Sequence, residues 1–118
     1  MSMNRYFRID ISTKDRQPIT DPELFKTVAE AIKDRYDGWN SYFPDSTLYG
    51  EGMNWYECDE DMTEISQRFP DLLFEVTCIG DLIDDMWAAG FCDGRSNVQY
   101  AAIPPLDYDW LLKGEGRK

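Results

Sequence analysis

Alternating apolar and polar residues near the start of the chain predict a β-strand. Phe7, Ile9 and Ile11 are separated by polar residues, so they fall on one side of an extended chain. This two-residue period is typical of a strand that buries one face. We expect the strand to run from Arg5 to Ser12.

A three-to-four-residue period follows and predicts a helix over residues 22–36. Its apolar positions share one face of the helix: Phe25, Val28, Ala29, Ile32 and Tyr36. Thr20 and Asp21 are alternative caps for its N-terminus, and Pro22 suits its first turn. Asp37 and Gly38 are typical of a helix end.

The middle of the chain predicts a loop, a strand and a second helix. Residues 39–45 are rich in aromatic residues and are expected to form a loop. Residues 47–56 are expected to form a strand that bends at its glycines. The second helix is expected to begin at Cys58 or Asp59 and to stop at Pro70. Its inward positions are predicted to be Met62, Ile65, Ser66 and Phe69.

Two further segments predict the rest of a sheet. Residues 72–79 read as a buried strand, and residues 86–103 read as a hairpin around Asp93–Gly94. Asp-Gly is a preferred pair for a two-residue type I′ turn. The resulting register is predicted to place three pairs of residues opposite each other: Trp87 and Tyr100, Ala89 and Val98, and Cys92 and Arg95.

These elements predict one α+β domain over residues 1–113. We expect a ferredoxin-like antiparallel sheet of four to five strands, with two main helices on one face. A last helical turn is expected at Tyr108 to Leu112, and residues 114–118 are expected to be a disordered tail.

The charge of the chain is concentrated in its later part. The whole protein has a net charge of −11. Residues 1–40 carry equal numbers of acidic and basic residues, whereas residues 41–112 carry fifteen acids and two bases. A field of one sign repels nucleic acid and membrane surfaces and attracts basic partners. We therefore expect a basic protein partner, no direct contact with nucleic acid and no membrane contact.

The histidine and cysteine content limits the kinds of catalytic site, metal site and disulfide that the chain can form. The chain has no histidine, which removes the commonest general base and most zinc sites. Its three cysteines form no CxxC pair, which favours a reduced, cytoplasmic setting over a disulfide framework. The N-terminus lacks the apolar core of a signal peptide, and no stretch is long enough to span a bilayer. No cofactor is expected.

Residues 53–103 resemble a class of small proteins encoded by phages and other mobile elements. The resemblance is carried by these positions: Trp55–Tyr56, Asp61–Met62, Ile65–Ser66, Phe69–Pro70–Asp71, Phe74, Asp85–Met86–Trp87 and Asp93–Gly94. These motifs are structural. What the resemblance implies is an origin in a mobile element and a ferredoxin-like α+β fold, without a defined activity. At Cys78–Ile79–Gly80 the chain departs from the more acidic turn expected of the class.

A cluster of carboxylates at the start of the second helix is the principal candidate for a partner-binding surface. It consists of Glu57, Asp59, Glu60, Asp61 and Glu64. An acidic loop is expected to extend this surface: Asp81, Asp84 and Asp85. Trp55 or Tyr56 would add apolar anchoring. The alternative is a solvated helix start that the helix dipole stabilises.

Carboxylates on a rigid fold can imitate the phosphates of nucleic acid. We therefore expect a non-enzymatic phage inhibitor that binds a basic, nucleic-acid-handling host defence protein in the host cytoplasm. The most specific form of this hypothesis is an anti-CRISPR protein. A phage structural or assembly protein, which would self-associate as a homodimer or larger assembly, is an alternative.

Two catalytic alternatives use the same carboxylates. Asp59 and Asp61, with Glu57 or Glu64, could hold Ca²⁺ or Mg²⁺, although the spacing does not match an EF-hand loop. A carboxylate pair could also serve a glycosidase, but nothing in the sequence sets the separation of such a pair. Cys58 lies among acids that disfavour a reactive thiolate.

Overall fold

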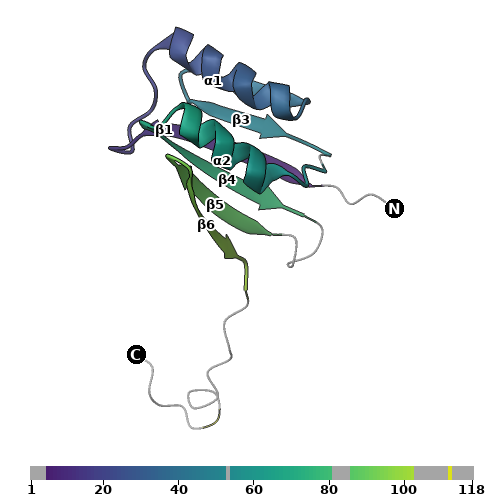
Figure 1. Ribbon diagram of the computed structural model, residues 1–118. Coiled ribbons are helices and arrows are strands. Elements are labelled where there is room, and N and C mark those ends of the chain that lie inside the picture. Colours follow the sequence, from purple (N-terminus) through teal and green to yellow (C-terminus); the bar gives the residue numbers. More distant parts are fainter. Residues whose placement is uncertain (1–4, 53, 81–85, 103–111, 113–118) are drawn as a thin grey trace.

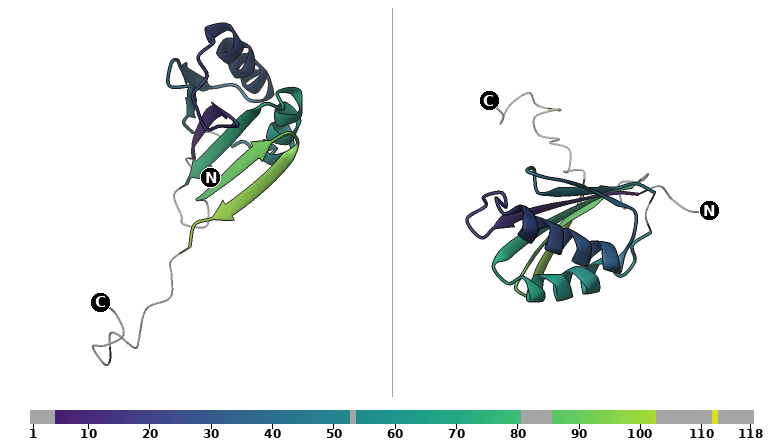
Figure 2. Two further views of the ribbon diagram at one scale, coloured as in Figure 1. Left: turned by 90° about the vertical axis from the view of Figure 1, so that its left-hand side faces the viewer. Right: turned by 90° about the horizontal axis from the view of Figure 1, so that it is seen from above.

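The described part of the chain forms a six-stranded antiparallel sheet with two helices on one face (Figures 1 and 2). The computed structural model describes residues 5–52, 54–80, 86–102 and 112. The strands are β1 (Tyr6–Thr13), β2 (Trp39–Tyr42), β3 (Thr47–Gly50), β4 (Leu72–Ile79), β5 (Trp87–Cys92) and β6 (Arg95–Tyr100). The helices are α1 (Pro22–Arg35) and α2 (Cys58–Arg68). The order across the sheet is β2-β3-β1-β4-β5-β6.

The sheet has more strands than the four to five expected from the sequence. The additional strand is β2, in the segment that was expected to be a loop. Trp39 points into the core and Asn40 points away, but four residues are too few for a two-residue period to stand out. The strand predicted over residues 47–56 ends earlier, at Gly50.

Both helices begin close to their predicted positions. Asp21 caps α1, because its carboxylate accepts a hydrogen bond from the backbone N–H of Glu23 at 3.0 Å. This result selects Asp21 over Thr20 as the cap. α2 begins at Cys58, and its first turn contains three acidic residues that face the positive end of the helix dipole.

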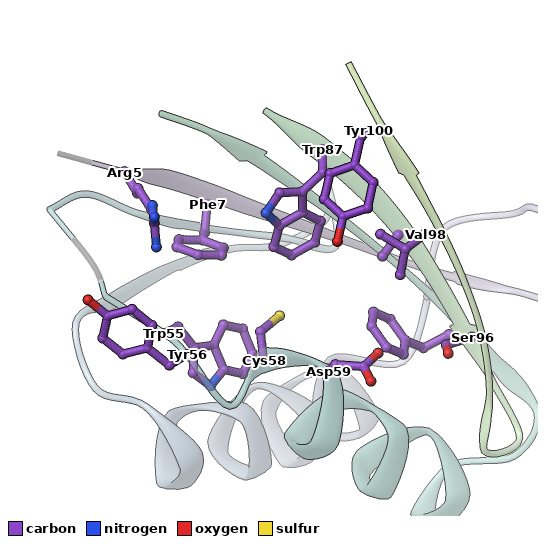
Figure 3. Close-up of a pocket in the computed structure, with 12 residues that line it drawn as sticks. Arg5, Phe7, Trp55, Tyr56, Cys58, Asp59, Trp87, Ser96, Val98 and Tyr100 are labelled. Carbon is purple, nitrogen blue, oxygen red and sulfur yellow. The ribbon is translucent and has the colours of Figure 1, made fainter. Parts of the chain in front are cut away.

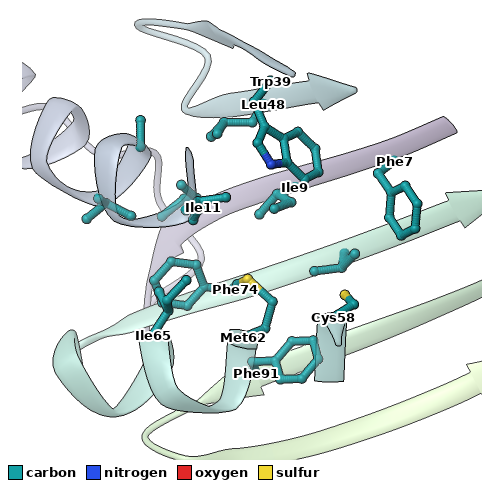
Figure 4. Close-up of a cluster of buried hydrophobic side chains, with 14 of the residues drawn as sticks. Phe7, Ile9, Ile11, Trp39, Leu48, Cys58, Met62, Ile65, Phe74 and Phe91 are labelled. Atoms are coloured by element: carbon teal, nitrogen blue, oxygen red, sulfur yellow. The ribbon is translucent and has the colours of Figure 1, made fainter. Parts of the chain in front are cut away.

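The core lies between the helices and the sheet (Figure 4). Phe7, Ile9 and Ile11 of β1 are at most 2% exposed, and Met62 and Ile65 of α2 are fully buried. Burying a side chain of this size contributes about 1.5–3 kcal/mol to folding. The apolar stripes read from the sequence therefore form the interface between the two layers.

The predicted hairpin register is confirmed. Trp87 lies opposite Tyr100, and Cys92 lies opposite Arg95. Asp93 and Gly94 have positive φ angles of 49° and 78°, as a type I′ turn requires. This register places β6 at the edge of the sheet (Figure 1).

Several expectations fall on residues that the structure does not describe. The loop at 81–85 and the tail at 114–118 lie outside the described residues, as does nearly all of the predicted turn at Tyr108 to Leu112. Within the part of the chain that is described, neither helix has the length and apolar character needed to cross a membrane.

Candidate functional site

A groove of about 450 Å³ separates the start of α2 from the β5–β6 hairpin (Figure 3). Its lining combines aromatic, small apolar and charged residues: Arg5, Phe7, Trp55, Tyr56, Cys58, Asp59, Trp87, Ala89, Phe91, Ser96, Val98 and Tyr100. Val98 and Tyr100 stand on the helix side of β6, yet they remain 37% and 70% exposed. The groove is therefore open to a partner along the β6 side.

Figure 3 shows how the groove is arranged from end to end. Arg5 and Tyr56 lie at one end, whereas Asp59 and Ser96 lie near the other, and Trp87 stands on the sheet side. The guanidinium carbon of Arg5 is 6.0 Å from the centre of the Tyr56 ring. A cation at this distance from an aromatic face is attracted by the ring quadrupole. One end of the groove thus already accommodates a guanidinium group.

Packed aromatic rings form the floor of the groove. The Phe7 ring contacts Trp39, Trp55 and Trp87 edge to face, with ring centres 6.3, 5.9 and 6.0 Å apart. Such pairs contribute about 0.5–1.5 kcal/mol each beyond their buried area. The floor is therefore a preformed surface.

Trp55 belongs to this floor and does not protrude as an anchor. It is 3% exposed, and its indole N–H donates a hydrogen bond to the Asp61 carboxylate at 2.8 Å. Tyr56 is 77% exposed and stands at the rim. Of the two aromatic anchors expected from the sequence, Tyr56 is accessible on the surface and Trp55 is not, because Trp55 packs into the core.

Two carboxylates of the predicted cluster form ion pairs with the other helix. Arg35, at the end of α1, forms ion pairs with Asp61 and with Glu64. The Arg35–Asp61 pair has a nitrogen-to-oxygen distance of 3.8 Å, and the Asp61 side chain is 16% exposed. Asp61 and Glu64 therefore tie α2 to α1, although the Glu64 side chain remains 53% exposed, and the role of the cluster in binding a partner stays a prediction.

The other three carboxylates of the cluster are exposed at the start of α2. They are Glu57, Asp59 and Glu60. Within the described ranges, no Lys or Arg forms an ion pair with any of them. Asp59 lines the groove. Within the described part of the chain, these acids are clustered at the start of α2, beside the groove.

The remaining acids of the later chain are spread over the structure. Asp45 lies between β2 and β3, and Asp71 lies between α2 and β4. Glu75 on β4 pairs with Arg16 at 3.5 Å. Asp81, Asp84 and Asp85 lie outside the described residues, so their contribution to the binding surface stays a prediction.

Cys58 is buried at the start of α2. It is 4% exposed. Burial raises the pKa of its thiol, and neighbouring Cys78, Asp59 and Asp61 raise this pKa further. The expectation that a thiolate is disfavoured is confirmed. Among the described residues, no group of three or more His, Cys, Asp and Glu side chains is placed to hold a metal ion.

A second hollow lies on the opposite, open face of the sheet. Tyr42 and Tyr49 stack edge to face there, with ring centres 5.5 Å apart. The Arg8 guanidinium lies 5.5 Å from the centre of the Tyr49 ring and also pairs with Asp10 at 2.9 Å. Arg8 and Asp10 neutralise each other, and Glu51 also lines this hollow, so it combines aromatic surface with one carboxylate that no described Lys or Arg pairs with.

Sequence reasoning missed the β5–β6 wall of the groove. The sequence pattern identifies Trp87, Val98 and Tyr100 only as members of cross-strand pairs. The predicted register already placed their side chains on one face, and this shared face was the available signal. What the sequence lacked was the position of α2 over the sheet, which leaves these side chains facing a groove.

Comparisons with known protein families, with curated proteins and with solved structures found no match for this chain.

Proposed function

We propose that this protein is a non-catalytic binding protein that holds a basic segment of a partner protein in the groove beside α2. The observation that carries the proposal is the position of exposed Glu57, Asp59 and Glu60 beside an open aromatic groove. Carboxylates attract Lys and Arg, and aromatic rings anchor the side chains of a partner. The net charge of −11 adds long-range attraction for such a partner.

The narrower form of the proposal is a phage-encoded inhibitor of a basic, nucleic-acid-handling host defence protein. It is supported by the acidic composition and by the resemblance of residues 53–103 to mobile-element proteins. In this form, the carboxylates at the start of α2 stand in for nucleic-acid phosphates. The acids at 81, 84 and 85 would extend the same surface.

We also infer that β1 to β4 and the two helices form a ferredoxin-like unit, to which the β5–β6 hairpin is added. The order β2-β3-β1-β4 and the chain order β-α-β-β-α-β support this assignment. A fold of this kind does not itself specify an activity. The added hairpin supplies one wall of the groove, so the proposed binding site depends on this addition.

A charge-matched pair of variants tests the proposal. One variant combines Glu57→Gln, Asp59→Asn and Glu60→Gln, and the control combines Asp15→Asn, Asp45→Asn and Asp71→Asn at exposed positions elsewhere. We expect the first variant to bind a polyarginine peptide about tenfold more weakly, because each exposed ion pair contributes a fraction of a kcal/mol. The control should bind close to the wild type.

The measurement is a fluorescence-anisotropy titration at low and at high salt. Wild-type binding should weaken as salt screens the charges. Equal weakening in both triple variants would show that only the overall charge matters, and it would contradict a binding site at the start of α2.

A further inference from the structure

The outer edge of β6 has backbone groups directed away from the sheet. Among the described strands, β6 pairs with β5 and has no neighbour on its other side. The N–H of Ala101 donates to the carbonyl of Met86 at 2.9 Å, so residue 101 directs its backbone toward the β5 side. In an antiparallel pair, this direction alternates from one residue to the next. Ser96, Val98 and Tyr100 therefore direct their N–H and C=O groups to the outer edge.

The same three residues line the groove. The side chains of Ser96, Val98 and Tyr100 lie on the helix side of β6, where they form part of the groove wall. A strand added to this edge would place every second side chain on the helix side as well. Those side chains would lie one strand spacing, ~4.8 Å, beyond the wall, on the side of the sheet where Asp59 lines the groove.

The β6 edge lacks the features that usually protect a sheet edge. β6 carries one charged residue, Arg95, and contains neither Pro nor Lys. All six of its residues are exposed. The opposite edge strand, β2, has four residues and is followed by Pro44. Short strands and nearby prolines discourage pairing, whereas a longer edge with few charges favours it.

We propose that an extended basic segment of a partner protein adds to β6 as a seventh strand and directs its Arg or Lys side chains into the groove. This inference rests on the proposed function, because the same carboxylates attract the segment. Strand addition supplies main-chain hydrogen bonds, and the groove supplies side-chain selectivity. The protein's own Arg5, held over the Tyr56 ring, is an internal example of a guanidinium in this groove.

A second copy of the chain suits the edge less well than a basic segment. Each copy carries a net charge of −11, so two copies repel each other. The one cation of β6, Arg95, alternates with the groove-lining Ser96, Val98 and Tyr100, so its side chain lies on the other face of the strand. The exposed carboxylates at the start of α2, beside the groove, therefore favour a basic partner.

The test uses an acetylated and amidated peptide of alternating Arg and Val, together with the variants Val98→Pro and Val98→Thr. Proline removes the outward N–H of residue 98 but leaves the hydrogen bonds to β5, whereas threonine keeps the N–H. We expect Val98→Pro to bind the peptide about fivefold more weakly or worse, the effect of losing a hydrogen bond. Val98→Thr reports the effect of changing this groove side chain alone, and it should bind the peptide more tightly than Val98→Pro does. Amide hydrogen exchange at Ser96 and Tyr100 of the wild type should slow when the peptide binds.

Each outcome decides between the proposals. If the peptide slows neither amide and Val98→Pro binds like Val98→Thr, strand addition is wrong, although weaker binding by the Glu57, Asp59 and Glu60 triple variant would still support the groove. If that triple variant also binds normally, the proposed function fails as well. A wild type that sediments as a dimer, with a monomeric Val98→Pro, would overturn the basic partner in favour of a second copy.

Discussion

Two groups of carboxylates on α2 have the same chemistry but different roles. Asp61 and Glu64 pair with Arg35 from α1, and Asp61 also accepts the hydrogen bond of the Trp55 indole. Glu57 and Asp59 lie less than two turns earlier and face solvent. The difference follows from where α1 crosses α2, and it separates carboxylates that stabilise the fold from carboxylates that can meet a partner.

The largest expected difference between the two groups is in stability. Asp61→Ala should lower the free energy of unfolding by about 1–3 kcal/mol, because it leaves the buried Trp55 N–H without its acceptor. Asp59→Ala, in the same first turn, loses a similar helix-dipole interaction but no such hydrogen bond. Urea unfolding of both variants measures the difference. Equal losses would contradict the assignment of a structural role to Asp61.

The pH dependence of stability should reveal the buried thiol between these carboxylates. Burial raises the pKa of Cys58, so the folded protein keeps this proton above pH ~8.5, where an unfolded cysteine loses it. The stabilising effect is complete below that pH and is lost as the pH rises. The slope is about 1.4 kcal/mol per pH unit for one group.

Cys58→Ala should therefore make the stability curve flatter between pH 8.5 and 10 than it is in the wild type. Urea unfolding at several pH values gives the two slopes. The variant also opens a small cavity, but that loss is the same at every pH, so only the slopes are compared. Identical slopes would contradict a buried, protonated Cys58.

A smaller effect is expected when the cation shared by Asp61 and Glu64 is removed. Arg35→Met should cost about 1 kcal/mol of stability or less, since its ion pairs are partly exposed. It should not weaken binding of a basic peptide, because Arg35 does not line the groove and its loss makes α2 more negative. Thermal unfolding and peptide titration measure these effects. Weaker peptide binding would mean that Arg35 itself belongs to the binding surface.

The smallest stability effect is expected at the exposed carboxylates. Glu57→Gln and Glu60→Gln should change the free energy of unfolding by no more than about 0.5 kcal/mol, as is usual for surface positions. Their association rate with a basic peptide should fall, because exposed charges mainly steer the encounter. Stopped-flow mixing at low salt measures this rate. An unchanged association rate together with lowered stability would mean that Glu57 and Glu60 stabilise the fold and do not steer the partner.

Local sequence patterns were sufficient for most of the elements. The two-residue period over Phe7, Ile9 and Ile11 and the Asp93–Gly94 turn depend on neighbours in sequence, and both were predicted correctly. β2 was missed because four residues carry too little periodicity. Element type was therefore predictable wherever the pattern extended over several residues.

The site was less predictable, because it depends on contacts between distant residues. The pairing of Glu64 with Arg35 joins residues 29 positions apart, and no local pattern indicates it. The groove depends on how α2 lies over the hairpin, which also follows from tertiary packing. The sequence located the cluster of acids but could not show that Asp61 and Glu64 are engaged within the fold.

The central claim is that the groove beside the start of α2, and not the open face of the sheet, receives a basic partner. A nuclear magnetic resonance titration of the full chain with the Arg-Val peptide tests it most directly. We predict that the shifted amides cluster at Tyr56, Asp59 and Trp87 and along Ser96 to Tyr100. Shifts concentrated at Tyr42 and Tyr49, with the groove unaffected, would contradict the account.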